Sequence, residues 1–298
     1  MILPIMKPPT YISYSSLMTW KTCPPKYYLT KVSGYKYKTR TGYPAGIGIA
    51  FDATVKEYIA GKLGFNDDRL SYKHLMKDFD CEQKDKAESI GRDTAVMYIK
   101  AGMADRILAK QGFGIKINRE VYGHWGTIPI LGVMDLILGN TPFDWKTRGF
   151  SRPTTPTDGY IYSCDHRGRD VGKSTRYSFP LEQDNEDWAY QFVFYNTLLG
   201  RPTEDYQAVI HEVVNTKDGV MFYEHDRRIK TDFIMKVKTD LFNMWSWISN
   251  DPFDIEVPKA EPKMSKCEKY NTLCDCACDC EPYKKVLEDP ANRWLYKG

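Results

Sequence analysis

The pattern of hydrophobic and polar positions between residues 128 and 147 predicts a β-hairpin. Apolar and β-branched residues dominate the stretch IPILGVMDLILGNTPFDWKT, and such residues favour strands. The run 139–142 in its middle, Gly-Asn-Thr-Pro, is a strong turn signal. Residues two apart on a strand point to the same face, so Asp144 and Lys146 project together, and Asp135 on the first strand can face them across the turn.

These three polar side chains allow two interpretations. Two carboxylates beside an ammonium can form a divalent-cation site next to a group that holds or deprotonates a water, as metal-assisted phosphodiester hydrolysis requires. The alternative is a surface hairpin with scattered charges, and Asp-x-Lys alone is a weak pattern. However, the strands are too apolar for an exposed hairpin, and Asp and Lys in such surroundings are seldom left unpaired. The hairpin alone supports the two interpretations about equally.

Other segments have helical or strand patterns. Residues 45–63 predict a Gly-rich entry into a helix that carries Asp52 and Lys56 as an i, i+4 pair. Residues 184–200 predict a helix with acidic residues at its start, Gly200 at its end, and Gln191 and Tyr195 on one face. Gln191 is either a satisfied core amide or, with Tyr195, reaches toward the active site. Further predictions are a helical part over 64–112, a strand pair over 206–226, and a final helix over 232–249.

Composition limits the class of protein. The 298 residues include 42 basic and 39 acidic side chains, for a net charge of +3, so a nucleic-acid surface must come from local clustering. No run of about 18 apolar residues is present, which argues against a membrane span. The first residues lack the charged start and apolar core of a signal peptide. We therefore expect a soluble, cytoplasmic protein with no membrane partner.

Two basic segments are candidates for nucleic-acid binding. In residues 31–43, Lys36, Lys38 and Arg40 alternate with tyrosines, which suits a strand whose phosphates need charge and whose bases need stacking. A solvated loop is an equally good interpretation of that segment. Residues 148–182 form a long connection rich in Gly, Pro, Ser and Thr that carries Arg148 and Arg152. A disordered loop is the alternative there, but the position directly after the candidate metal site favours a substrate-clamping loop.

The eight cysteines are unevenly placed, because five of them fall within residues 267–280. Disulfides would explain such a cluster in a secreted chain, but no secretion signal is present. In a cytosolic chain, a cluster of this kind more often binds zinc or an iron–sulfur centre. We therefore favour metal or cluster binding over disulfides.

Several of these motifs occur together in the order typical of one family. They are Ser13-Tyr14-Ser15 through Cys23-Pro24 with Tyr27-Tyr28, then Gly132-Val133-Met134-Asp135, then Asp144-Trp145-Lys146-Thr147, and finally Gln191 with Tyr195. With these motifs the chain resembles the PD-(D/E)XK nuclease superfamily, specifically its RecB-like branch and the related iron–sulfur exonucleases, which include CRISPR-associated and AddB-type relatives. Each motif is weak alone, and their shared order makes the metal-site interpretation the better one.

The resemblance implies an α/β fold: a central mixed β-sheet flanked by helices, with a helical N-terminal part and a Cys-rich C-terminal tail. It also implies a single nuclease domain over 1–298. In such a domain, Asp135 and Asp144 would bind Mg²⁺ or Mn²⁺. Lys146 would orient or activate the attacking water, and Gln191 and Tyr195 would contact the substrate backbone or support the site.

The chain departs from the family pattern at three places. Many relatives carry a histidine as an extra metal ligand where this chain has Asp52, which we carry over as a third ligand because aspartate suits hard cations. The connection between Lys146 and Gln191 is longer than in the family, consistent with an inserted loop at 148–182.

In iron–sulfur members, one N-terminal and three C-terminal cysteines hold a [4Fe–4S] cluster. This pattern points to Cys23 as the N-terminal ligand and to Cys267, Cys274 and Cys280 as the C-terminal ligands. The tail that carries these three, 260–298, would then close on Cys23. Cys276 and Cys278 compete for these places, and zinc is the alternative to the cluster.

Taken together, the sequence predicts a metal-dependent deoxyribonuclease, most simply an exonuclease that acts on DNA that is single-stranded or has free ends. One alternative is a nucleic-acid-binding module that keeps the cysteine centre and has no significant cleavage. Another is a sequence-specific endonuclease of the same superfamily. The chain has no helicase segment, which suggests a stand-alone nuclease, and a virus-encoded enzyme acting in the host cytoplasm is one form this could take.

Overall fold

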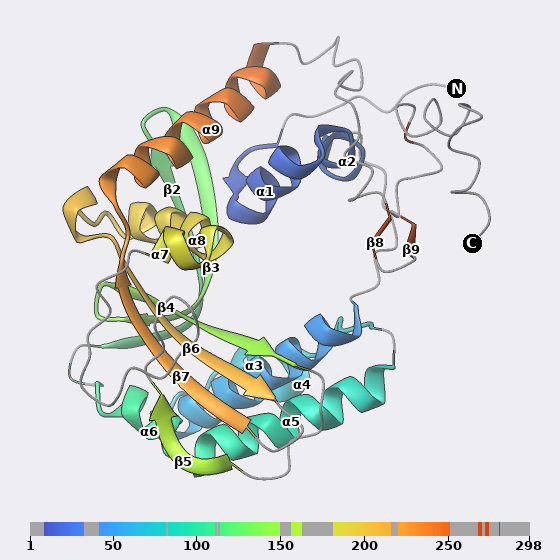
Figure 1. Ribbon diagram of the computed structural model, residues 1–298, viewed down its shortest axis with the longest axis vertical. Coiled ribbons are helices and arrows are strands. Elements are labelled where there is room, and N and C mark those ends of the chain that lie inside the picture. The colour runs from blue at the N-terminus through green and yellow to red at the C-terminus, as the bar shows by residue number, and fades with distance from the viewer. Residues whose placement is uncertain are drawn as a thin grey trace. The chain divides into compact units, whose positions relative to one another are not determined.

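Figure 1 shows a computed structural model of the chain. The structure describes residues 9–32, 42–81, 83–110, 112, 114–149, 156–162, 181–215, 220–250, 268–269, 272–273 and 280. The chain divides into two compact units. The terminal unit consists of Met1–Thr39, Tyr122–Leu131 and Met235–Gly298, and the sheet unit consists of Arg40–Val121 and Gly132–Ile234.

The strands of the sheet are both parallel and antiparallel. Their order is β1-β3-β4-β6-β7-β5, and β2 also pairs with β3. The predicted hairpin is formed by β3 (Ile128–Leu138) and β4 (Thr141–Arg148), which pair antiparallel. The remaining strands of the sheet are β1 (Ile12–Ser13), β2 (Ile115–Trp125), β5 (Pro156–Tyr162), β6 (Gln207–Asn215) and β7 (Val220–Arg228). The central mixed sheet predicted from the sequence is confirmed.

Alternation along β4 divides its side chains between two layers of helices. Phe143 and Trp145 are buried in a core with Phe51 of α3 (Tyr43–Lys62) and Tyr98 of α5 (Lys84–Lys100). Their sequence neighbour Lys146 points the other way, to Gln191. Gln191 belongs to α8, which covers Glu186–Leu198. Helices α4 (Tyr72–Leu75) and α6 (Met103–Leu108) also lie in the range 64–112 for which helices were predicted, and α7 (Leu181–Asp184) precedes α8.

The ends of α8 are set by its local sequence, and Gly200 stands at the end that the sequence predicted. Asn185 caps the helix, because its side chain accepts a hydrogen bond from the Trp188 backbone N–H at 3.0 Å. Gly200 follows the last turn with a φ of +65°, a left-handed conformation that glycine adopts without steric cost. The helix therefore begins and ends where the local sequence favours it, and this fixes the position of Gln191 and Tyr195 along it.

A polar network is buried on the α5 side of the sheet, behind the candidate site. Trp145 Nε1 donates to the Tyr98 hydroxyl at 3.0 Å, and that hydroxyl also pairs with His211 Nδ1. Burial raises the pKa of Tyr98 and lowers that of His211, so both side chains are neutral around pH 7. Three aromatic side chains on α5, β4 and β6 thus share their hydrogen bonds, which holds the strand that carries Asp144 and Lys146.

The terminal unit has a helical N-terminal part, as predicted. It contains α1 (Tyr14–Thr22), α2 (Pro24–Tyr27) and a π-helical turn over Tyr28–Val32. Ser13 caps α1 by accepting from the Ser16 N–H at 3.2 Å. Most of α9 (Thr231–Asn250) also belongs to this unit, and Lys21 of α1 pairs with its Asp240 at 2.6 Å. Two short paired strands, β8 (Glu268–Lys269) and β9 (Thr272–Leu273), lie near the C-terminus.

One strand falls in a segment that was expected to be a loop. Residues Pro156–Tyr162, within the basic connection 148–182, form β5, which pairs parallel with β7. The sequence there, PTDGYIY, mixes strand-favouring residues with Pro, Asp and Gly, which strands disfavour, so local pattern alone does not indicate it. Pairing with the edge of an existing sheet supplies the stabilisation that the local sequence lacks.

Candidate active site

The hairpin register brings Asp135 and Asp144 together. Leu136 pairs with Phe143, which places Asp135 directly across from Asp144, and residues opposite each other on paired strands share a face. The two carboxyl groups are hydrogen-bonded. The Asp144 side chain is 2% exposed, whereas that of Asp135 is 26% exposed and can be reached from solvent.

The electrostatic environment separates these two carboxyl groups. Burial raises the pKa of Asp144 well above its ordinary value, and Asp135 adds to this shift while the Lys146 ammonium opposes it. Burial acts in the same direction on Asp135, but Lys56, the hydrogen bond with Asp144 and Lys146 together outweigh it and lower the pKa of Asp135. A proton taken up by this pair is therefore favoured at Asp144 over Asp135.

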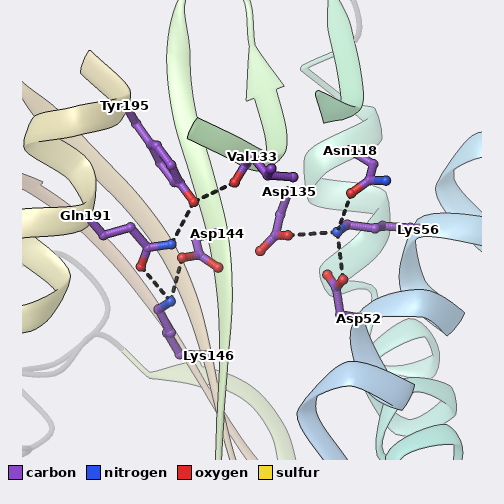
Figure 2. A network of polar contacts seen from close by, with 9 residues as sticks. All are labelled: Asp52, Lys56, Asn118, Val133, Asp135, Asp144, Lys146, Gln191 and Tyr195. Carbon is purple, nitrogen blue, oxygen red and sulfur yellow. Dashed lines mark hydrogen bonds and ion pairs between the residues drawn. The ribbon is translucent and has the colours of Figure 1, made fainter. Parts of the chain in front are cut away.

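Lys146 is held in place by two acceptors. Its Nζ donates to Asp144 Oδ2 at 2.5 Å and to Gln191 Oε1 at 2.8 Å, as Figure 2 shows. The amide of Gln191 completes a chain: its Nε2 donates to the Tyr195 hydroxyl at 2.8 Å, and that hydroxyl donates to the Val133 carbonyl at 2.6 Å. Because an ammonium can only donate, the carbonyl side of the Gln191 amide must face Lys146.

Two glycines let the helices come close enough to make these contacts. A Cβ atom at Gly132 of β3 would lie 2.7 Å from Leu198 Cδ1 and 3.2 Å from Tyr195 Cδ1, so glycine lets these two side chains of α8 pack directly against β3. On α3, a Cβ at Gly48 would lie 2.8 Å from Thr147 Oγ1 of β4. Gly48 stands one turn before Asp52, so close packing at this point helps to bring Asp52 to the hairpin.

Helix α3 adds Asp52 and Lys56 to the site. Lys56 Nζ lies 2.6 Å from Asp52 Oδ2, 2.7 Å from Asp135 Oδ1 and 3.3 Å from Asn118 Oδ1. The i, i+4 pair of Asp52 and Lys56 was predicted, but the contact of Lys56 with Asp135 was not, because 79 residues separate them in the sequence. The contact of Asn118 with Lys56 was not predicted either. Asn118 has a left-handed backbone conformation on β2, with a φ of +48°, which the sequence pattern does not indicate.

The side chains of the site that could hold a hard divalent cation such as Mg²⁺ or Mn²⁺ are Asp52, Asp135 and Asp144. Asp52 and Asp135 are about a quarter exposed, and within the described residues Asp52 Oδ1 is a buried oxygen with no hydrogen-bond partner. Burial, followed by repulsion from Asp135, raises the pKa of Asp52 to about 7 although Lys56 opposes the shift. Carboxylate oxygens of this kind are the ligands that such cations prefer. Across the described ranges, however, no three His, Cys, Asp or Glu side chains are placed so that together they could hold a metal ion.

Arg148 extends the polar surface from the site along β4. Its Nε lies 2.6 Å from Glu212 Oε1, and its guanidinium stacks 5.0 Å from the centre of the Trp188 ring. Glu212 Oε2 in turn lies 2.9 Å from His225 Nε2. The Arg148 side chain is 55% exposed, so its guanidinium is both anchored and accessible. The other predicted nucleic-acid contacts, Lys36, Lys38, Arg40 and Arg152, lie outside the described residues.

The predicted cysteine ligands are only partly described. Cys23 and Cys280 are both buried and both belong to the terminal unit. Cys267 and Cys274 lie outside the described residues, as do Cys276 and Cys278. A cysteine-ligated centre, iron–sulfur or zinc, therefore stays a prediction.

None of the helices in the described part of the chain is both long and apolar enough to span a membrane.

Comparisons with known proteins give likenesses at the level of structure. No family model matches the chain, and no curated protein matches it. It is similar to a crystal structure from Eubacterium rectale named "Putative exonuclease", with 10% identity, a TM-score of 0.47 and 82% of both chains covered. It is also similar to the crystal structure of SSO0001, with 14% identity, a TM-score of 0.25, and coverage of 77% of this chain and 85% of that one. Likenesses at this level do not establish an activity, which has to be inferred from the site itself.

Proposed function

We propose that the protein is a metal-dependent nuclease that hydrolyses phosphodiester bonds of DNA. The observation that carries this proposal is the convergence of Asp135, Asp144 and Lys146 on neighbouring strands, with Lys146 oriented by Gln191 of α8. These are the residue types and the order that the resemblance to the PD-(D/E)XK superfamily implies. The interpretation as a solvated surface hairpin is disfavoured, because Asp144 is almost fully buried and paired with Lys146.

In this proposal, Asp135 and Asp144 hold the cation, and Asp52 is a candidate third ligand through its unpaired Oδ1. A bound Mg²⁺ or Mn²⁺ would polarise a phosphoryl oxygen and lower the pKa of a coordinated water. Lys146 uses two of its three N–H donors within the described part of the chain, for Asp144 and Gln191. Its third donor is available to a phosphate oxygen or to the attacking water, where it stabilises the negative charge that develops during hydrolysis.

Gln191 and Tyr195 keep that ammonium in position. The hydrogen bonds from Gln191 to Tyr195 and from Tyr195 to the Val133 carbonyl fix the Gln191 side chain to the backbone of β3. The backbone anchor lies two residues before Asp135, so one strand supplies both a cation ligand and the support of Lys146. A lysine held in this way loses little further entropy when it contacts the substrate, which favours the transition state.

The proposal extends to DNA as the substrate and to cleavage from a free end. The anchored guanidinium of Arg148, exposed at the end of β4, suits a phosphate of a bound strand. The basic segments 31–43 and 148–182 would add further contacts and favour a strand that enters by a free end. In the terminal unit, the cysteine tail would hold a [4Fe–4S] cluster or a zinc ion.

The test uses end-labelled single-stranded and duplex DNA, incubated with and without Mn²⁺. We expect metal-dependent shortening by the unmodified protein and a loss of at least about 100-fold in Lys146→Ala, the size typical for removal of an oriented electrostatic group. Lys21→Ala is the matched control, because it breaks a lysine–aspartate pair of the terminal unit. DNA retarded but never shortened would support the binding-module alternative instead, and discrete fragments from duplex DNA would support an endonuclease.

A further inference from the structure

Lys56 is a buried cation inside the candidate site. The residue is 3% exposed, and its ammonium is surrounded by oxygens of Asp52, Asp135 and Asn118 at 2.6, 2.7 and 3.3 Å. These three acceptors use all three N–H donors of the ammonium. Two carboxylate oxygens lie within 2.7 Å of this ammonium, and opposite charges at that distance favour its charged form.

Fold stability does not account for this arrangement. Removing charges from water costs more than a buried ion pair usually returns, so apolar side chains of similar volume would serve a core position at least as well. The arrangement also uses an unfavourable backbone conformation, because Asn118 has a φ of +48° within strand β2. Features of this kind concentrate at functional sites, and Lys56 directly contacts a carboxylate that is proposed to bind the metal.

Asp135 lies between two positions for positive charge. On one side it accepts from Lys56 (Figure 2), and on the other it lies directly across the hairpin from Asp144, where the cation is proposed to bind. Enzymes that use two metal ions for phosphodiester hydrolysis hold them about 3.5–4 Å apart. Such ions also share carboxylate ligands. Here Asp135 has the position of the shared carboxylate, with an ammonium on one of its sides.

We propose that the Lys56 ammonium takes the place of one of two cations, so that the site binds a single divalent ion at Asp135 and Asp144. This inference rests on the proposed function. Asp52 Oδ2 and Asn118 Oδ1 are then the remaining ligands of the fixed ammonium. Lys56 is a positioning residue: it orients Asp135 and supplies a positive charge that does not depend on the metal concentration.

Charge balance supports one divalent ion rather than two. The three carboxylates and two ammonium groups of the site, Asp52, Asp135, Asp144, Lys56 and Lys146, have a formal net charge of −1 when all are ionised. One divalent cation and one phosphodiester group bring this site to neutrality. A second divalent cation would leave two uncompensated positive charges in a partly buried site, which is unfavourable in a medium of low dielectric constant.

The inference is tested by counting bound Mn²⁺, without DNA and without any measurement of activity. Electron paramagnetic resonance gives the concentration of free Mn²⁺ during a titration, and hence the number of tight sites on the full chain. We expect one tight site in the unmodified protein and two in Lys56→Met, where Asp52 and Asp135 lose the ammonium between them. Lys21→Met, which breaks the Lys21–Asp240 pair of the terminal unit, is expected to keep one site. The cysteines do not add to this count, because Mn²⁺ prefers oxygen to thiolate ligands.

Each outcome of this titration decides a specific point. Two tight sites in the unmodified protein, or one site in both the unmodified protein and Lys56→Met, would overturn the inference and leave the proposed function intact. An unmodified protein with no tight site would overturn the proposed metal centre itself. If Lys56→Met does not fold in metal-free buffer, we expect Mn²⁺ to restore the folded circular dichroism spectrum, and failure of that rescue would also overturn the inference.

Discussion

Asp144 is the residue whose environment is most specific to a cation site. It lies almost fully buried beside a second carboxyl group, and the Lys146 ammonium opposes the resulting rise of its pKa. A bound cation would favour the ionised form of Asp144 further. A purely structural ion pair between Asp144 and Lys146 would not require a second carboxyl group beside Asp144, whereas a cation site does.

The raised pKa of Asp144 predicts how cation affinity depends on pH. A divalent ion must displace the proton of Asp144, so its apparent affinity should rise with pH, by up to about tenfold per unit, in the range above the ordinary aspartate pKa of about 3.9. The Lys146 ammonium lowers the pKa of Asp144, so Lys146→Met should raise it further and move the whole curve to higher pH.

Mn²⁺ titrations at several pH values between about 5 and 8 would measure this dependence, with Lys21→Met as the control that keeps the unmodified curve. A Mn²⁺ affinity independent of pH over that range would show that the Asp135–Asp144 pair is not the binding site. A curve for Lys146→Met that moves to lower pH would contradict the assigned role of Lys146.

At the scale of elements, the site depends on how closely two helices approach the hairpin. Helix α8 supplies Gln191 and Tyr195 across Gly132 of β3, and α3 supplies Asp52 and Lys56 beside β4. The stability of each helix does not by itself bring these side chains to the hairpin. Each depends on a glycine that removes a side chain at the point of closest contact.

Gly132→Ala should therefore weaken both stability and activity. The added Cβ would lie 2.7 Å from Leu198 Cδ1 and 3.2 Å from Tyr195 Cδ1, so the Leu198 side chain must turn aside and the Tyr195 ring must give way, at a cost of about 1–3 kcal/mol in the free energy of unfolding. Displacement of the Tyr195 ring lengthens the bond between its hydroxyl and the Val133 carbonyl and disturbs the position of Lys146. Urea unfolding and single-turnover DNA cleavage measure the two effects.

Two further variants isolate the cause. Gly61→Ala on α3, where a Cβ would meet nothing within 4 Å, should leave activity unchanged and stabilise the helix by up to about 1 kcal/mol. Leu198→Ala combined with Gly132→Ala removes the contacting methyl group and should restore part of the lost activity. Full activity in Gly132→Ala alone would show that close packing of α8 is not required.

Much of this arrangement is local enough to be predicted from the sequence. The apolar run around Asp135, the turn at 139–142 and the Asp144–Lys146 spacing specify the hairpin, and the cap at Asn185 and the stop at Gly200 specify α8. The contact of Lys56 with Asp135 could not be predicted, because the periodicity of α3 places Lys56 beside Asp52 but does not reveal which strand the helix meets. Asn118 and β5 were missed for a similar reason, since a left-handed residue and an added edge strand both depend on tertiary pairing.

At the scale of the whole molecule, the two units carry different predicted chemistry. All of Asp52, Asp135, Asp144 and Lys146 belong to the sheet unit, whereas Cys23 and Cys280 belong to the terminal unit. The chain joins the units several times, since each is built from separate stretches of sequence. A metal centre that ties Cys23 to the C-terminal tail would link distant parts of the terminal unit and would stabilise it by closing a long loop.

This division predicts that the cysteine centre and the candidate active site can be lost separately. Cys23→Ser should remove most of the bound iron or zinc from protein purified without oxygen, as measured by metal analysis and by the visible absorption of an iron–sulfur cluster. Cys81→Ala is the matched control, because Cys81 is a buried cysteine of the sheet unit that lies near Gly46. It should keep the full metal content. The tight Mn²⁺ site should persist in folded Cys23→Ser, since its ligands all belong to the sheet unit.

Undiminished iron or zinc in Cys23→Ser would exclude Cys23 as a ligand, and a metal-free unmodified protein would exclude the centre altogether.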